Sequence, residues 1–594
     1  MRYRLPAFLV ATFLSSGHAF CEPAVASAPS PQTESAQLKQ LLDEQWAFTL
    51  KNSPELATIV GDERYNHLWS DVSAEHAEKV LKINEEFLKK FESIPRTHLS
   101  DQEILSLDMM IRQLKDRIEY AQLKLWEMPV DQFNGIQISL PGFISSIPFK
   151  TVKNYEEYIE RLKSIPKILK DTEEVCRLGM KDKLMQPRFL LEKAAQQAAS
   201  IAGPAGTANV FGMPALNFPS SIPVADQKRL KTQIIQAVNN DVRPAYKQFA
   251  QFLKEDYAPN GRVDEGIWAL PGGDDIYRFD VRSLTTTTKT PEEIHAIGLA
   301  QVEKIEADMT EIAHKLGFAD LASLRKSVQT DKKLYAKSPD EILELYRHYI
   351  AQMQPELPKL FGILPKTPLE VRPVEAYREN EAADAEYHQG TPDGSRPGIV
   401  FVNTGDYAKR DIYTIEDTAY HEGVPGHHLQ IAIAQTMPVP AFRQQGDYTA
   451  YIEGWALYAE HLGKDMGFYK DLYNDYGRLN GELLRADRLV LDTGVHAMHW
   501  DRKQMIDFFR AHPAESEPGM EAEVDRYIAW PAQALGYMLG QQTILNLREE
   551  AKKELGDKFD IRKFHDAVLS GGAMPLDMLE TRIKAWIVKE KASH

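Results

Sequence analysis

The chain has 594 residues, of which 43% are hydrophobic and 26% are charged, as in soluble globular proteins that bury a large core. Its formal net charge of −16 argues against a nucleic-acid partner, because binding a phosphate backbone requires a basic surface. The two cysteines, Cys21 and Cys176, lie far from the polar motifs described below, so catalysis by a thiol is not expected.

The first residues have the pattern of a secretory signal peptide. Arg2 and Arg4 precede an apolar run of about ten residues, and small residues follow that run. We therefore expect a signal peptide over residues 1–19, with cleavage as late as residue 26 as an alternative. Residues 20–37 are rich in Pro, Ala, Ser and Gln, which is typical of a flexible leader.

Cys21 raises the alternative of lipid attachment. His18 and Phe20 are unusual neighbours for that modification, and simple cleavage is favoured. After the signal there is no apolar run long enough to cross a membrane. The sequence thus predicts a periplasmic or secreted protein without a membrane span.

Most of the remaining chain has apolar residues three and four positions apart, which is typical of amphipathic helices. In chain order, helices are predicted over residues 74–91, 102–125, 155–170, 230–253, 291–316, 339–353, 417–436, 448–467, 476–500, 503–512, 520–540 and 541–555. Strand signal is sparse, and the best candidate is Gly398–Asn403, which is β-branched and aromatic.

The predicted fold class is therefore mainly α, with one small β-sheet near residue 400. Proline and glycine are frequent around residues 258–273. We accordingly predict an N-terminal helical region, residues 38–260, that walls the site, and a catalytic helical region, residues 261–594, that contains it.

The most informative motif is His-Glu-Gly-Val-Pro-Gly-His-His, from His421 to His428. A catalytic zinc ion takes three protein ligands and keeps a fourth position for water. His421 followed directly by Glu422 matches a metal ligand beside a general base. On a regular helix His427 would lie about 600° around the axis from His421, which is roughly the opposite side. The chain must therefore leave helical geometry between them, and the intervening proline and glycine permit this. His427 is the predicted second ligand, and His428 is held in reserve.

A third ligand is expected from a neighbouring helix. Glu453 stands in a strongly apolar helix, where a carboxylate needs a cation or a hydrogen-bond partner. Glu460 follows two turns later on the same face and could orient a ligand histidine. One Zn²⁺ ion is predicted, although this ligand set also suits other divalent metals. With both cysteines distant, a closed structural zinc site is poorly supported.

These motifs continue in three further segments. They begin at Glu453 (Glu-Gly-Trp-Ala-Leu-Tyr), Arg488 (Arg-Leu-Val-Leu-Asp-Thr-Gly-Val-His) and Arg526 (Arg-Tyr-Ile-Ala-Trp-Pro-Ala-Gln-Ala-Leu-Gly-Tyr). From about residue 36 to its end the chain resembles the bacterial family named domain of unknown function 885. The metal motif of that family is similar to that of glutamate-liganded zinc peptidases such as thermolysin and angiotensin-converting enzyme. The resemblance implies a large helical metallopeptidase-like fold with a deep cleft. The six-residue histidine spacing departs from the four-residue pattern and leaves the second ligand open.

Peptide hydrolysis also needs a donor to the oxyanion of the tetrahedral intermediate, and Tyr537 and His496 are the candidates. Arg526 and Gln533 share a polar stripe with Tyr537 on a predicted helix, which indicates a face turned to a wet cavity. Arg526 could pair with a substrate carboxylate, although an internal salt bridge is equally compatible. The strand that ends at Asn403 could align a substrate backbone by edge pairing, or be an ordinary edge strand.

The sequence thus predicts a secreted zinc-dependent hydrolase, most simply a metallopeptidase of carboxypeptidase or dipeptidase type that cleaves short peptides. Two alternatives stay open at this point: a zinc hydrolase of non-peptide amides or esters, and a non-catalytic binding protein stabilised by its metal. A serine hydrolase is disfavoured because the chain lacks a Gly-x-Ser-x-Gly elbow. The sequence does not indicate an oligomeric state.

Overall fold

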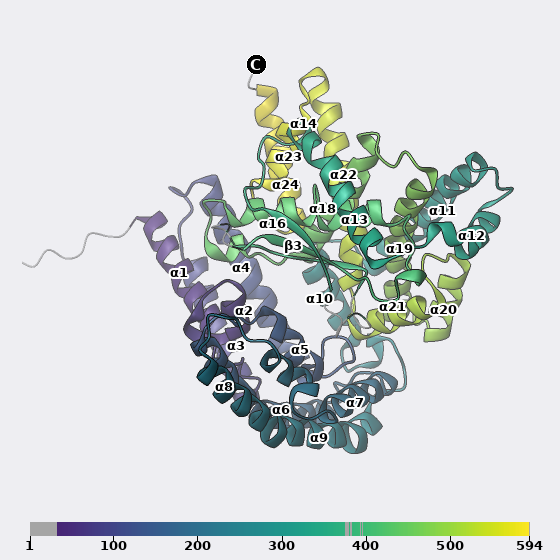
Figure 1. Ribbon diagram of the computed structural model, residues 1–594. Coiled ribbons are helices and arrows are strands. Elements are labelled where there is room, and N and C mark those ends of the chain that lie inside the picture. The colour runs from purple at the N-terminus through teal and green to yellow at the C-terminus, as the bar shows by residue number, and fades with distance from the viewer. Residues whose placement is uncertain (1–32, 375–378, 380–382, 392–393, 395, 593–594) are drawn as a thin grey trace, which may run out of the picture.

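The computed structural model describes residues 33–374, 379, 383–391, 394 and 396–592, so the predicted signal peptide and most of the leader lie outside the described residues. The described chain is mainly helical with one small sheet, which confirms the predicted fold class (Figure 1). Helix α1 begins at Glu34, because the Thr33 side chain accepts a hydrogen bond from the Ala36 amide. The last four residues of the predicted leader are therefore helical.

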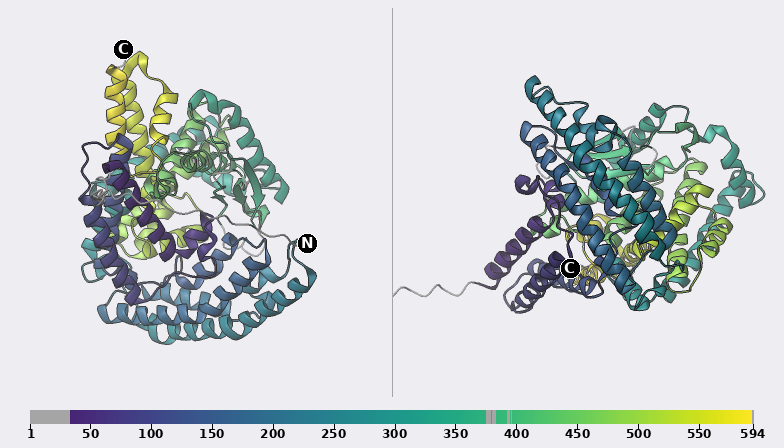
Figure 2. Two further views of the ribbon diagram at one scale, coloured as in Figure 1. Left: turned by 90° about the vertical axis from the view of Figure 1, so that its left-hand side faces the viewer. Right: turned by 90° about the horizontal axis from the view of Figure 1, so that it is seen from below.

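The N-terminal helices form a curved layer along one side of the molecule, coloured purple to dark teal (Figures 1 and 2). They are α1 (Glu34–Asn52), α2 (Pro54–Ile59), α3 (Ala74–Glu92), α4 (Asp101–Gln122), α5 (Ile136–Gly142), α6 (Val152–Asp182), α7 (Arg188–Ala202), α8 (Val224–Ala237) and α9 (Arg243–Phe252). A π-helical turn at Val238–Val242 joins α8 to α9, so the single helix predicted there is nearly continuous.

The remaining helices pack above this layer. They are α10 (Gly273–Thr285), α11 (Pro291–Lys315), α12 (Leu321–Thr330), α13 (Pro339–Met353), α14 (Leu357–Leu360), α15 (Ile415–Glu422), α16 (His427–Gln435), α17 (Ala441–Gln444), α18 (Thr449–Asp465), α19 (Leu472–His496), α20 (Arg502–Ala511), α21 (Glu517–Ala529), α22 (Gly536–Leu555), α23 (Ile561–Leu569) and α24 (Leu576–Ala592). None of these or the earlier described helices has the length and apolar composition needed to cross a membrane.

The helix predicted over residues 520–540 is interrupted. Helix α21 ends at Ala529, and α22 starts only at Gly536. Between them Ala532 has a left-handed backbone with φ of 64°. Its amide donates to the buried carboxylate of Asp492 at 2.9 Å. This tertiary hydrogen bond stabilises a chain reversal that local periodicity does not indicate.

The sheet has three strands, β1 (Leu369–Pro373), β2 (Ala385–His388) and β3 (Gly398–Val402), in the order β1-β3-β2. Strand β3 pairs parallel with β1 and antiparallel with β2. The predicted strand at Gly398 is therefore present but central, and both of its hydrogen-bonding edges are occupied. Pairing of a substrate with the edge of this strand is excluded by that position, which corrects the prediction from sequence.

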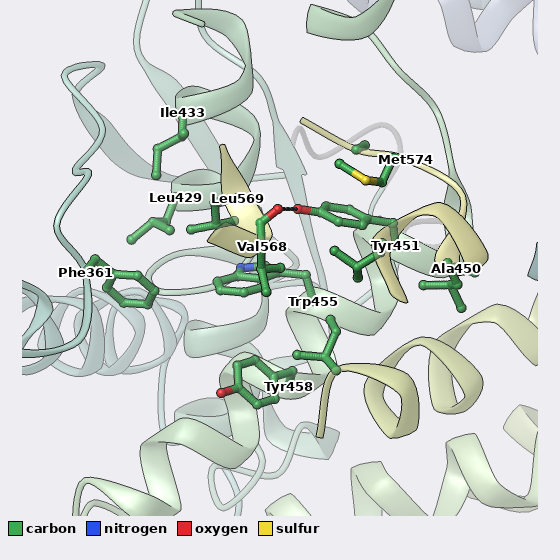
Figure 3. Packing of buried hydrophobic residues seen from close by; sticks show 14 of the residues in the cluster. Phe361, Leu429, Ile433, Ala450, Tyr451, Trp455, Tyr458, Val568, Leu569 and Met574 are labelled. Atoms are coloured by element: carbon green, nitrogen blue, oxygen red, sulfur yellow. Dashed lines mark hydrogen bonds between the residues drawn. The ribbon is translucent and has the colours of Figure 1, made fainter. Parts of the chain in front are cut away.

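Buried apolar residues form three clusters. One combines α1, α3 and α4 with residues from 336 to 587, a second joins residues around α10, α11, α19 and α21, and a third lies within residues 130–258. The core therefore does not divide at residue 260, because the first helices pack into the C-terminal part. In the first cluster the Tyr451 hydroxyl donates to the Val568 carbonyl at 3.0 Å, and Trp455 lies at the centre (Figure 3). This packing fixes α18, the helix that contains Glu453.

Candidate metal centre

Three side chains from three helices meet at one point. His421 lies in the last turn of α15, His427 begins α16 and Glu453 lies in α18. One ligand atom of each lies within 4.8 Å of the other two. The Oε2 atom of Glu453 is 3.5 Å from Nε2 of His421 and 3.6 Å from Nε2 of His427. The two imidazole rings are perpendicular, with centroids 4.7 Å apart. The sequence motif is therefore a compact cluster in space.

A break between α15 and α16 brings the two histidines together. Helix α15 ends at Glu422, and α16 starts at His427 after four intervening residues. The Gly426 amide turns back to donate to the Tyr420 carbonyl at 3.0 Å. A Cβ atom on Gly426 would lie 2.0 Å from the carbonyl oxygen of His421, so this close approach requires glycine. The predicted departure from helical geometry is therefore present. It allows His421 and His427, six residues apart, to reach the same cluster.

The donor set fits a zinc ion. Imidazole and carboxylate ligands bind zinc at about 2.0–2.2 Å, so neighbouring ligands of a tetrahedral ion lie about 3.3–3.5 Å apart. The two measured separations from Glu453 are close to that value. On the other edge of its ring, Nδ1 of His427 is buried without a hydrogen-bond partner among the described residues. His421, His427 and Glu453 are thus the residues that would hold the ion.

Glu460 contacts the opposite edge of the His421 ring. His421 Nδ1 donates to Glu460 Oε1 at 2.6 Å, and both side chains are buried. This hydrogen bond points Nε2 of His421 at the cluster, which is the orientation that a metal ligand requires. Burial lowers the pKa of His421, but the carboxylates of Glu453 and Glu460 outweigh it and raise this pKa well above its usual value.

Glu422 lies beside the cluster but outside it. Its Oε1 atom is 4.0 Å from His421 Nε2. Burial raises the pKa of Glu422, and His427, His421 and Arg485 oppose that shift. A carboxylate with a raised pKa at this position is suited to accept and return a proton at neutral pH.

The structure separates His428 from the cluster. The Tyr387 hydroxyl lies 3.1 Å from Nδ1 of His428, and the rings pack edge to face against the sheet. Burial lowers the pKa of His428 to about 4, so its imidazole is neutral. Of the two candidates for the second ligand, His427 is the one that the fold brings to His421.

Tyr537, Arg526 and Gln533 lie near one another. The Arg526 guanidinium donates to Gln533 Oε1 at 2.6 Å and pairs with Glu523 at 3.2 Å. Tyr537 lies in the first turn of α22, with the guanidinium of Arg488 over its ring at 4.5 Å. Arg526 is thus already paired, as in the internal salt bridge considered above, and Gln533 is its partner.

His496 and Asn403 have structural partners. Nε2 of His496 donates to the Tyr527 carbonyl at 2.9 Å, while Nδ1 accepts from the Ile267 amide at 3.0 Å. With both ring nitrogens in use and burial lowering its pKa to about 3, His496 is not available as an oxyanion donor. It lines a separate cavity of about 760 Å³ that none of the residues from 421 to 428 lines. Asn403 accepts from the Gly405 amide at 3.1 Å and donates to the Glu379 carbonyl at 2.7 Å, and it stabilises the loop after β3.

Two residues that the sequence analysis did not select also lie here. Asp417 is buried one turn before His421 on α15. A side chain at Gly481 would meet Oδ2 of Asp417 at 2.8 Å and Nη1 of Arg485 at 3.3 Å, so both groups lie against the same point of α19. The sequence feature that could have identified Asp417 is its four-residue spacing from His421, which places both residues on one face of a helix. For Arg485 there is none, because its position depends on how α19 packs on α15.

The fold and the site together define a mainly α-helical protein with two imidazoles and a carboxylate gathered beside a further glutamate. The chain belongs to a bacterial family of unknown function, DUF885, which matches residues 54–583. A solved structure from Colwellia psychrerythraea is 28% identical, with a TM-score of 0.89, and the match covers 94% of this chain and 100% of that one. A second, from Shewanella oneidensis, is 18% identical with a TM-score of 0.67 over 93% and 99% of the chains, and shows the fold alone. Both are described as a "putative lipoprotein". No curated protein matches the chain.

Proposed function

We propose that this protein is a zinc-dependent hydrolase that cleaves short peptides, of carboxypeptidase or dipeptidase type. The observation that supports it is the convergence of His421, His427 and Glu453 with Glu422 directly beside them. Two histidines and one carboxylate with an adjacent glutamate are the constellation of catalytic zinc sites in peptidases.

When bound, a zinc ion at this position polarises the substrate carbonyl and lowers the pKa of water towards about 7. Glu422 accepts the proton of the attacking water and passes it to the amine that leaves. The Tyr537 hydroxyl donates to the oxygen of the tetrahedral intermediate, while the Arg488 guanidinium packs over the Tyr537 ring. Glu460 keeps the His421 ring in one orientation during these steps.

We place this activity outside the cytoplasm, in the periplasm or as a secreted protein. The signal-peptide pattern of the first residues supports this, and so does the lipoprotein description of the two similar structures. Mass spectrometry of the mature N-terminus distinguishes cleavage from lipid attachment at Cys21.

The test is digestion of a peptide library by the zinc-loaded protein, with mass spectrometry of the products. Glu422→Gln should keep its zinc and lose activity by about 10²- to 10⁴-fold, whereas the exposed Glu75→Gln on α3 serves as a control that keeps both. His421→Ala should lose the zinc.

Three results would point elsewhere. Undiminished turnover by Glu422→Gln removes it as the general base. Products from ester or non-peptide amide panels but from no peptide favour a different hydrolase. A zinc-loaded protein that hydrolyses none of these substrates, and in which Glu422→Gln changes nothing, is a metal-stabilised binding protein.

A further inference from the structure

Two arginines on one face of α19 have buried donor atoms without a hydrogen-bond partner among the described residues. Arg485 and Arg488 are three residues apart and so lie on the same side of the helix. Arg488 donates to Glu523 at 3.0 Å and to the Tyr527 hydroxyl at 3.1 Å, and its Nη1 is buried without a partner among the described residues. Arg526 shares that same Glu523. One carboxylate therefore serves two guanidinium groups.

Arg485 forms no direct ion pair with any described residue, although its charge acts on the buried Asp417 carboxylate. Within the described part of the chain its side chain donates only to the carbonyl oxygen of Gly481, at 3.1 Å, and no acidic oxygen lies within 4.0 Å. Its Nε is buried and unpartnered. A guanidinium presents five N–H donors, and a buried donor without an acceptor is costly. Arg485 is thus short of an acceptor in the protein alone.

The two arginines lie against different helices that pack on α19. Arg485 lies against α15 where Asp417 precedes His421 by one turn, and its charge acts on Glu422. Arg488 lies over the Tyr537 ring on α22.

Helix α22 in turn packs tightly on the part of α18 that contains Glu453. A Cβ atom on Gly540 of α22 would lie 1.9 Å from the carbonyl oxygen of Ala450 and 2.7 Å from Cα of Gly454. Arg485 and Arg488 thus lie against α15, which contains His421, and against α22, which packs on the helix of Glu453.

We propose that Arg485, with Arg488 beside it, binds a carboxylate of the substrate. This inference rests on the proposed function and deepens it. It assigns a binding residue other than Arg526, whose donors are shared with Glu523 and Gln533. A guanidinium pairs with a carboxylate through two parallel hydrogen bonds, which gives affinity and orientation together. The carboxylate belongs either to the free C-terminus of a short peptide or to an acidic side chain near the cleaved bond.

The experiment measures binding, so that it does not depend on turnover. Zinc-loaded Glu422→Gln protein is titrated calorimetrically with acetyl-Ala-Ala-Ala as the free acid, with its C-terminal amide, and with acetyl-Ala-Glu-Ala amide. We expect the free acid to bind more tightly than the amide, and Arg485→Gln to weaken it by about 10- to 100-fold without affecting the amide. Preferred binding of the glutamate peptide instead identifies a side-chain carboxylate.

Two further variants sharpen the result. Arg485→Lys keeps the charge without the planar pair of donors and should recover part of the affinity for the acid. Arg510→Gln on α20 removes an exposed arginine that pairs with Glu517, and should leave all three affinities unchanged.

Equal affinity of the Glu422→Gln protein for the acid and both amides, or no binding of any probe, overturns the carboxylate subsite. So does an Arg485→Gln variant that weakens acid and amide equally, since that indicates a structural role. Library digestion by the unmodified protein decides the hydrolase proposal separately. A peptidase without this subsite is therefore distinguishable from a protein that hydrolyses no peptide.

Discussion

Glu460 accepts a 2.6 Å hydrogen bond from Nδ1 of His421, and both groups are buried between α15 and α18. The bond connects two helices and orients one imidazole toward the point where His427 and Glu453 also converge. Because the carboxylate holds one tautomer and increases the basicity of the ring, its effect should appear in metal affinity before it appears in stability.

Replacement of Glu460 by Gln tests this relationship. The amide keeps the shape but loses the charge, so zinc affinity should fall by about 10- to 100-fold. Competition with a chromogenic chelator measures that change, and Glu75→Gln on the exposed face of α3 controls for the loss of one carboxylate. Unchanged zinc affinity would show that the hydrogen bond only supports the fold.

The two adjacent histidines should behave differently. His427→Asn removes a predicted ligand and should abolish stoichiometric zinc binding, because two protein ligands hold zinc weakly. His428→Asn removes the contact with Tyr387 and should keep one zinc per chain, although it should unfold at a lower temperature. Elemental analysis of both purified variants decides the matter, and the opposite outcome would make His428 the ligand.

The Tyr537→Phe variant tests the role of the Tyr537 hydroxyl while it keeps the aromatic ring. The phenyl group keeps its contact with Arg488, while the donor to the oxyanion is lost. We expect kcat to fall by about 10²- to 10³-fold, with zinc content and melting temperature preserved. Tyr407→Phe on the surface provides the control. A variant with normal kcat would exclude Tyr537 from the reaction.

Gly426→Ala should damage the connection between α15 and α16. The added Cβ would meet backbone oxygen at 2.0 Å, so the loop must move and carry His427 with it. A loss of about 2 to 4 kcal/mol in unfolding free energy is expected, together with weaker zinc binding. Gly142→Ala in α5 is the matched control, since no atom lies within 4 Å of its added Cβ, and it should stabilise by up to about 1 kcal/mol. Equal stability of both variants would contradict the steric argument.

Asp487 gives a pH-dependent prediction away from the site. It is fully buried in α19, and neither carboxylate oxygen has a hydrogen-bond partner in the described structure. Burial raises its pKa well above the usual value, so the folded protein keeps a proton that the unfolded chain releases near about pH 4. Above that pH the folded state binds the extra proton, and stability decreases as pH rises.

Asp487→Asn removes this titration. Relative to the unmodified protein, the variant should gain stability as pH increases, by up to about 1.4 kcal/mol per pH unit. Urea unfolding at about pH 5, 6.5 and 8 measures the difference, and exposed Asp308→Asn on α11 should show no such trend. A constant difference across this pH range would mean that the folded-state carboxyl titrates normally.

Local sequence predicted several elements almost to the residue. The periodicity of apolar side chains indicated α3 and α13 with nearly correct ends, because each has a clear cap and one buried face. The strand at Gly398 was found from its β-branched composition. The sequence did not predict that this strand is central in the sheet, because its partner β1 lies 25 or more residues earlier in the chain.

The predictions that were wrong, and the site residues that were not predicted, concern positions that depend on contacts between distant segments. Ala532 interrupts a predicted helix because its amide reaches Asp492, forty positions earlier. His496 is removed from the candidate site by hydrogen bonds to Ile267 and Tyr527. Arg485 comes to lie by Asp417 only when α19 packs on α15. In each case local preference is overridden by burial of polar groups that need a partner.

The sequence by itself determined the types of helix and strand and the chemistry of the motif, because caps, periodicity and ligand types are local properties. Tertiary structure brought His427, the histidine that the motif favours, to His421, and it alone decided which strand is central and which arginine lies by Asp417. Those outcomes depend on the packing of helices far apart in the chain, where the need to satisfy buried polar groups selects one arrangement from many.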